Sequence, residues 1–174
     1  MSDKAPKTIP TEIELSFTVD NLDPIIEQAK TLREGGQQEL HVRRVIYKND
    51  GDFHIRSSEE SKDGETSYVI SLKEDLMKQG VVSGMKKALE IDLPVSREQQ
   101  GCLLDMFKLI GFKETTRFEK NRVSIGVGDV QIDLDDYDLP EGKVYNVEIE
   151  GPTEKSIYAV AHRLFPDGLP ASKK

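Results

Sequence analysis

The sequence predicts one α+β domain built on an antiparallel β-barrel that is closed or nearly closed, with a charged interior and amphipathic helices packed outside. Three observations predict this fold. Most of the chain alternates polar and apolar residues at the period of a strand, short turn sequences join these runs, and only three segments carry an apolar stripe at helical spacing. Many short strands joined by tight turns are typical of an antiparallel sheet. Closure into a barrel would remove the edges of that sheet.

Length and composition suit a single globular domain. The 174 residues match one ordinary domain, which we expect at residues 11–166, with flexible tails at residues 1–10 and 167–174. The formal net charge is −8 and no basic stripe is present, so we expect no nucleic-acid partner. Cys102 is the single cysteine, which suits a reducing compartment. No membrane-length apolar run and no secretory signal are present, so we expect a cytoplasmic protein with no membrane partner.

Eight segments alternate as strands. They are residues 11–18, 41–47, 53–56, 67–73, 89–95, 117–127, 130–136 and 144–150. The polar, glycine-containing segments 49–52 and 126–129 each lie between two such runs, so we predict hairpin turns there.

Three segments are predicted as helices from their starting residues and their apolar stripes. Asp23 precedes Pro24 and is expected to cap the first helix. Ser96 and Gln99 form a capping box for the second, and Thr153 can cap the third. The stripes are Ile25, Ile26, Ala29 and Leu32 in the first helix, Leu103, Leu104, Phe107 and Ile110 in the second, and Ile157, Val160, Ala161 and Leu164 in the third.

Charged residues are paired two apart along five of the predicted strands. The pairs are Glu12 and Glu14, Glu90 and Asp92, Lys120 and Arg122, Asp133 and Asp135, and Glu148 and Glu150. Residues two apart share one face of a strand, so each pair presents like charges side by side. Such charges repel unless a cation or a charged ligand compensates them. The alternative is an ordinary wet sheet face, as in an acidic interaction domain.

The residue types indicate which ligand a charged barrel interior would hold. A site whose ligands are carboxylate oxygens alone favours Mg²⁺ or Mn²⁺. The cations Arg56, Lys73, Lys120 and Arg122 are suited to phosphate oxygens. A ligand that needs both sets is a metal-bound triphosphate or polyphosphate. We expect this small molecule as the partner of a monomer or homodimer.

These motifs together resemble the CYTH superfamily, the triphosphate tunnel metalloenzymes, over nearly the whole chain. The segments that carry the resemblance are Glu12-Ile13-Glu14 near the N-terminus, Val69 to Lys73, Lys120-Asn121-Arg122, Asp133-Leu134-Asp135 and Glu148-Ile149-Glu150-Gly151. Three positions differ from the family pattern. Ser16 stands where lysine is usual, His54 begins the segment where Arg-x-Arg is usual, and Ala88 stands where an arginine is expected.

The resemblance implies a metal-dependent hydrolase of inorganic, nucleoside or thiamine triphosphate, bound inside the barrel. The implied catalytic residues are Glu12, Glu14 and Glu148. The implied metal ligands are Glu12, Glu14, Asp133, Asp135, Glu148 and Glu150, and the implied phosphate ligands are Arg56, Lys73, Lys120, Arg122 and His54. Glu90 and Asp92 are expected to line the tunnel. A class IV adenylyl cyclase and a non-catalytic binder of a phosphorylated ligand remain open as alternatives on the same fold.

Overall fold

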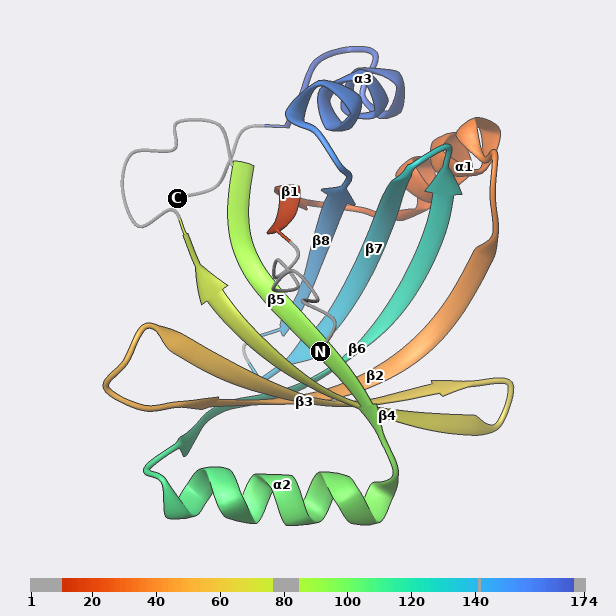
Figure 1. Cartoon of the computed structure of the whole chain (residues 1–174). Helices are drawn as coiled ribbons and strands as arrows, with labels where there is room; N and C mark the ends of the chain where they lie inside the picture. Colours follow the sequence, from red (N-terminus) through yellow and green to blue (C-terminus); the bar gives the residue numbers. More distant parts are fainter. Residues whose placement is uncertain (1–10, 77–84, 141, 171–174) are drawn as a thin grey trace, which may run out of the picture.

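Eight antiparallel strands close into a barrel in the computed structural model, which describes residues 11–76, 85–140 and 142–170 (Figure 1). The order around the barrel is β1-β5-β4-β3-β2-β6-β7-β8, and β8 returns to pair with β1. The strands are β1 (Thr11–Val19), β2 (Gln37–Lys48), β3 (Phe53–Lys62), β4 (Glu65–Asp75), β5 (Met85–Val95), β6 (Lys113–Val127), β7 (Val130–Leu139) and β8 (Gly142–Glu150). The predicted fold class is confirmed. The predicted tail at residues 1–10 lies outside the described residues.

The predicted hairpin turns are present, and the turn between β3 and β4 is among those that were not predicted. Gly128, at φ 63°, lies in the two-residue turn between the paired residues Val127 and Val130. β3 runs well beyond its predicted end at residue 56, to a tight turn at Asp63 and Gly64, whose φ angles of 52° and 86° are left-handed. Aspartate followed by glycine is suited to such a turn. The end of β3 was missed because residues 57–62 carry no apolar alternation.

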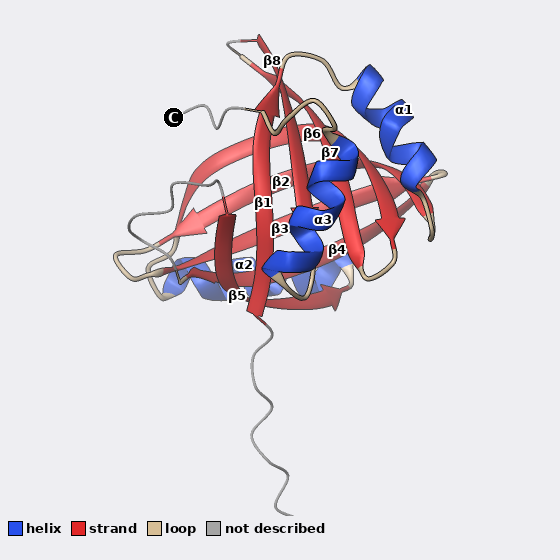
Figure 2. Ribbon diagram, turned by 90° about the horizontal axis from the view of Figure 1, so that it is seen from above, coloured by secondary structure: helices blue, strands red, loops and turns tan. Residues whose placement is uncertain are grey.

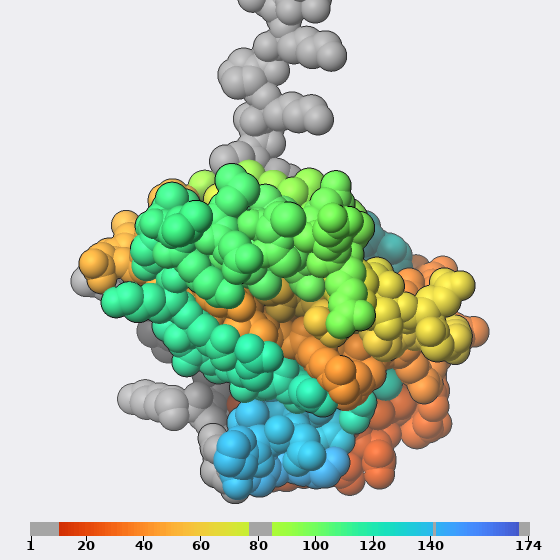
Figure 3. All heavy atoms as spheres, turned by 90° about the horizontal axis from the view of Figure 1, so that it is seen from below, coloured from red at the N-terminus to blue at the C-terminus, as the bar shows by residue number. Residues whose placement is uncertain are grey.

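Three helices in the described part of the chain pack on the outside of the barrel. They are α1 (Asp23–Leu32), α2 (Arg97–Leu109) and α3 (Glu154–Leu164). Figure 2 shows α1 and α3 on one side of the barrel and α2 on the opposite side. Seen from that opposite side, α2 lies across the barrel beside the start of β6 (Figure 3). None of the helices within the described residues is long and apolar enough to cross a membrane.

Two of the three predicted helix caps are present. Ser96 and Gln99 form the reciprocal capping box of α2, and the Thr153 side chain accepts a hydrogen bond from the Ser156 amide at the start of α3. The prediction for Asp23 is wrong, because α1 begins one residue earlier and Leu22 occupies the cap without a side-chain hydrogen bond. Asp23 therefore lies in the first turn, where its negative charge still suits the positive end of the helix dipole.

The hydrophobic core lies between the barrel and its helices. One cluster joins α1 and α3 to the outer faces of β1, β6, β7 and β8, and Leu169, within the predicted tail 167–174, packs against it. A second joins Leu103, Leu104 and Phe107 of α2 to Tyr47, Ile55, Ile70 and Phe112. Ile110 was wrongly placed in the α2 stripe: it follows the end of the helix and is 68% exposed. Because the apolar faces turn outward to the helices, the charged faces turn inward, as predicted.

Candidate functional site

A cavity of about 1550 Å³ runs through the barrel and is lined by inward-facing side chains of all eight strands. It contains the predicted residues Glu12, Glu14, His54, Arg56, Lys73, Glu90, Asp92, Arg122, Asp133, Glu148 and Glu150. Ten carboxylate side chains and six lysine or arginine side chains line it. The cavity surface therefore carries an excess of negative charge, which a bound cation would offset.

Lys73 is the centre of one cluster of ion pairs, formed by β1, β3, β4 and β5. Its Nζ atom lies 2.6 Å from a carboxylate oxygen of Glu12, 3.2 Å from one of Glu90 and 3.8 Å from one of Glu14. Glu90 also pairs with Arg56, whose Nε has no hydrogen-bond partner although it is buried. On the same wall, Asp92 accepts a hydrogen bond from the Ser71 hydroxyl.

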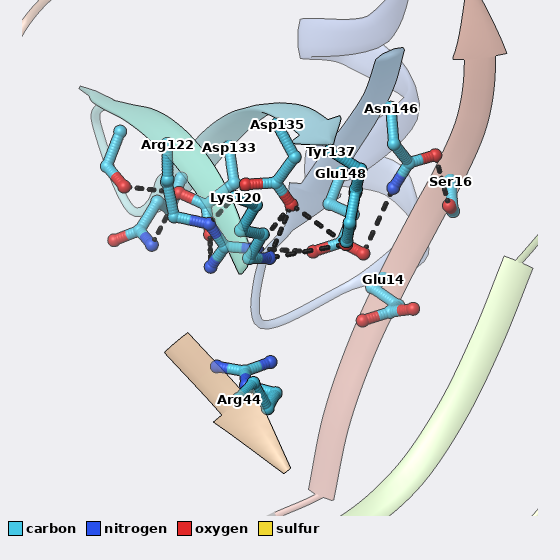
Figure 4. A network of polar contacts seen from close by, with 12 residues as sticks. Glu14, Ser16, Arg44, Lys120, Arg122, Asp133, Asp135, Tyr137, Asn146 and Glu148 are labelled. Carbon is cyan, nitrogen blue, oxygen red and sulfur yellow. Dashed lines mark hydrogen bonds and ion pairs between the residues drawn. The ribbon is translucent and has the colours of Figure 1, made fainter. Parts of the chain in front are cut away.

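Asp135 is the centre of a second cluster, on β6, β7 and β8 (Figure 4). It is fully buried and accepts hydrogen bonds from Nε and Nη2 of Arg122, both at 2.7 Å, and from Nζ of Lys120 at 2.6 Å. Burial alone would raise the pKa of Asp135, but the hydrogen bonds and charges of Arg122 and Lys120 hold that pKa below its usual range.

Lys120 and Asp135 do not lie on the cavity surface, although both face inward as predicted. Lys120 is only 2% exposed, lies 5.1 Å from the centre of the Tyr137 ring and donates a hydrogen bond to the Tyr137 hydroxyl at 3.3 Å. Burial, together with the nearby Arg122 charge, lowers the pKa of Lys120 to about 8. In this structure the two predicted ligands neutralise each other beneath Tyr137.

Arg122 connects this buried cluster to the cavity. Besides Asp135, it pairs with Asp133 and, through Nη2, with a Glu148 oxygen at 2.9 Å. The Asn146 side chain donates a second hydrogen bond to Glu148 at 3.1 Å, so this carboxylate is held from two sides. Burial raises the pKa of Asp133, although Arg122 opposes the shift.

The seam between β1 and β8 brings like charges face to face. Glu14 and Glu150 are directly paired in register, and both line the cavity. Glu14 has a cationic partner, Lys86, at 2.8 Å, whereas Glu150 has no ion-pair or hydrogen-bond partner among the described residues. Burial and the nearby carboxylates of Glu12, Asp133 and Glu14 raise the pKa of Glu150 to about 7. Of the two carboxylates at this seam, Glu14 is thus paired with a cation and Glu150 has no ion pair among the described residues.

The three positions that depart from the family pattern have distinct surroundings. The Ser16 hydroxyl donates a hydrogen bond to the Asn146 side chain at 3.3 Å. His54 lines the cavity, and burial lowers its pKa, which favours the neutral ring. Ala88 is buried, but Lys86 lies two residues away on the same face of β5 and reaches Glu14. Lys86 thus supplies a cation near the position where the arginine is missing.

Phe118, Tyr137 and Arg44 are among the cavity residues that were not predicted from the sequence. Phe118 and Tyr137 share a strand face with the predicted Lys120 and Asp135, so the alternation that found the charged residues also contained these two. Arg44 of β2 lacked such a signal, because that strand carries apolar residues on both faces. Its Nε donates a hydrogen bond to Ser58 at 2.9 Å, and no carboxylate of the described residues lies within ion-pair distance.

The carboxylates are distributed around the cavity. Within the part of the chain that the structure describes, no three histidine, cysteine, aspartate or glutamate side chains converge closely enough to hold a metal ion. The chemistry of the donors nevertheless suits a hard divalent cation. Glu12, Glu14, Glu148 and Glu150 line one cavity and offer oxygen atoms alone.

Solved structures of other proteins share this fold. The PH1012 protein from Pyrococcus horikoshii is 23% identical, with a TM-score of 0.69 over 88% of this chain and 90% of that one. A candidate adenylyl cyclase from Hippeastrum with a dominant triphosphatase activity is 14% identical, with a TM-score of 0.63 over 90% of this chain and 87% of that one. The RNA triphosphatase domain of a mimivirus mRNA capping enzyme is 13% identical, with a TM-score of 0.61 over 90% and 88%.

The resemblance to the CYTH superfamily is thus confirmed at the level of the fold. No family model and no curated protein sequence matches the chain.

Proposed function

We propose that this chain is a divergent CYTH protein that hydrolyses a triphosphate in its barrel cavity with the help of Mg²⁺ or Mn²⁺. One observation carries the proposal: Glu14 and Glu150 oppose each other across the β1–β8 seam inside a closed barrel whose other walls supply lysine and arginine. Like charges directly opposite on a ladder are destabilising unless something compensates them. A divalent cation between these carboxylates would do so.

The carboxylates nearest this seam would hold the metal. Glu12, Glu14 and Glu150 come first, because these three interact electrostatically and Glu150 forms no ion pair among the described residues. Glu148 and Asp133 lie on the neighbouring strands β8 and β7, directly paired with each other. A cation bound there would neutralise negative charge on the phosphate oxygens of the substrate.

The cations of the cavity would bind the phosphates. Arg122 presents a planar guanidinium that is already aligned by Asp135, and Lys73 and Arg56 approach from the opposite wall. Each is now paired with a carboxylate, so triphosphate binding would exchange carboxylate oxygens for phosphate oxygens of the same geometry. Burial inside the barrel strengthens these interactions relative to those in water.

Glu148 is the residue best placed to orient the attacking water. Arg122 and Asn146 fix its carboxylate from two directions, which holds one orientation toward the cavity. A fixed carboxylate can accept a proton from water as the water attacks the terminal phosphorus in line.

Phosphate release tests this proposal. Tripolyphosphate, ATP and thiamine triphosphate would each be supplied with Mg²⁺, with Mn²⁺ and without metal. We expect metal-dependent release that Glu148→Gln and Glu14→Gln each reduce at least about 100-fold, as is common when an electrostatic catalytic group is lost. Glu119→Gln, on the outer face of β6, is the matched control and is expected to retain full activity. Release that is independent of metal, or unchanged in both variants, would contradict the proposal.

Two alternative functions, a nucleotide cyclase and a binding protein without turnover, are each supported by one observation. The Hippeastrum protein of the same fold is a candidate adenylyl cyclase, so cyclic AMP should be measured in the ATP reactions. The absence of basic side chains at Ser16 and Ala88 supports a binding protein without turnover. That function would give no phosphate release, while tripolyphosphate with Mg²⁺ would still raise the melting temperature.

A further inference from the structure

One section of the cavity wall offers apolar and aromatic surface that phosphate binding does not use. We propose that Phe118, Tyr137 and Ile46, with Arg44 beside them, hold the flat organic group of a triphosphate ester. The substrate of this cavity would then be an organic triphosphate in preference to inorganic tripolyphosphate. This inference rests on the proposed function and specifies its substrate class.

The strand register brings these residues together on the inner surface. Phe118 of β6 is paired with Arg44 of β2, which is paired with Ser58 of β3. The same row continues through Val69 of β4 to Pro94 of β5. All five side chains line the cavity. The row thus crosses five adjacent strands and contains one charged residue, Arg44, between apolar and small polar neighbours.

Phe118 and Tyr137 form the aromatic part of the section. Their ring centres lie 5.4 Å apart with an angle of 53° between the ring planes, and both rings are half-buried and line the cavity. Ile46 lies two residues from Arg44 on the same face of β2. Aromatic faces of this kind stack on flat heterocycles, whereas a hydrated phosphate gains nothing from them.

Arg44 differs from the other cavity cations. Arg56, Lys73, Lys86 and Arg122 each pair with a carboxylate that lines the cavity, and Lys87 pairs with Glu154 outside it, whereas Arg44 donates to the neutral Ser58 hydroxyl. Figure 4 shows Arg44 on its own strand, with no dashed line joining it to the Arg122 network.

A guanidinium of this kind binds phosphate oxygens and also stacks on planar groups. Arg44 therefore lies where the charged and the apolar parts of an organic triphosphate would meet.

The test compares ligands that differ only in whether an organic group is present. The melting temperature would be measured against concentration for tripolyphosphate, ATP and thiamine triphosphate, each with Mg²⁺, and kcat/KM would be measured for the same three. The variants are Phe118→Ala and Phe118→Leu, the second of which preserves apolar volume in case the first folds poorly. Phe53→Ala is the matched control, because Phe53 lies on the outer face of β3 and is 45% exposed.

We expect Phe118→Ala to weaken binding of at least one organic triphosphate about tenfold, the size typical of one stacking contact, and tripolyphosphate by less than about twofold. Phe118→Leu should show a smaller change of the same selectivity, and Phe53→Ala none. Equal effects on all three ligands, or no effect of either Phe118 variant, would overturn the inference. Wild-type protein that binds and hydrolyses tripolyphosphate alone would overturn it while leaving the proposed function intact. Protein that neither binds nor hydrolyses any of the three would overturn both.

Discussion

Arg122 donates two parallel hydrogen bonds of 2.7 Å to the carboxylate of Asp135, which is fully buried. The same carboxylate also accepts a hydrogen bond from Lys120. One buried negative charge is therefore paired with two positive charges. Arg122 uses its remaining hydrogen-bonding capacity to pair with Glu148, which lines the cavity. The pair fixes the orientation of the guanidinium before any ligand arrives.

Asp135→Asn is expected to destabilise the protein by about 3–5 kcal/mol, because it leaves Arg122 and Lys120 buried without their shared countercharge. Urea denaturation followed by circular dichroism measures this. Asp138→Asn, at an exposed position of the same strand, is the control and should change the free energy of unfolding by less than about 0.5 kcal/mol. Similar values for the two variants would mean that the buried network does not hold this wall together.

Glu150 is expected to make stability depend on pH between about 4.5 and 7. Its pKa is raised to about 7 in the folded protein, so the folded state binds the proton more tightly than the unfolded chain does. The contribution of Glu150 is therefore fully present below about pH 4.5 and is lost as the pH rises through 7. Glu150→Gln should flatten this decline in metal-free buffer, as measured by urea denaturation at pH 5 and pH 8.

Saturating Mg²⁺ should also flatten the decline, because a cation favours the charged carboxylate. Glu154→Gln, on the exposed surface of α3, is the control and should keep the wild-type pH dependence. If the Glu150 variant declines as steeply as wild type, the charge at the β1–β8 seam is already compensated.

Arg44→Ala is expected to weaken binding of tripolyphosphate with Mg²⁺ about tenfold, because it removes a guanidinium that has no carboxylate partner among the described residues. Titration calorimetry measures this affinity. Arg43→Ala is a close control, since Arg43 is the adjacent residue, points outward and pairs with Glu119. Equal affinity in the two variants would place Arg44 outside the phosphate site.

Ser96→Ala is expected to cost about 1 kcal/mol of stability without changing ligand affinity. The substitution removes the side-chain half of the capping box at the start of α2, which packs outside the barrel. Urea denaturation and calorimetry on the same preparation separate the two effects. A loss of ligand affinity would show that α2 also shapes the cavity.

The barrel and most of its lining follow from alternation alone. The doublet Glu12 and Glu14 could be placed on an inner face because Ile13 and Leu15 require an apolar environment on the other. The depth of a residue within the barrel does not follow in this way. Lys120 and Arg122 share a face, yet one lies beneath Tyr137 and the other lines the cavity, since cross-strand neighbours decide which side chain is covered.

Arg44 shows a second limit of sequence analysis. In β2, the inner face carries Val42 and Ile46 beside Arg44, and the outer face carries Tyr47 against α2. A strand with apolar residues on both faces does not reveal which way its charged residues point. The pairing of Arg44 with Phe118 and Ser58 joins residues far apart in the chain, and it became visible only with the register of the sheet.

The pairing of the first strand with the last also governs how the molecule reaches its native state. Within the described sheet, β1 pairs with β5 and β8, and its β8 partners lie more than a hundred positions later in the chain. Contacts of such long sequence separation carry a large loop-closure entropy and make folding slow. During synthesis, the barrel cannot close until β8 has left the ribosome. Glu14 and Glu150 can therefore pair only after residue 150 has been synthesised, and a truncation that removes β8 would leave β1 paired with β5 alone, with its other edge open to aggregation.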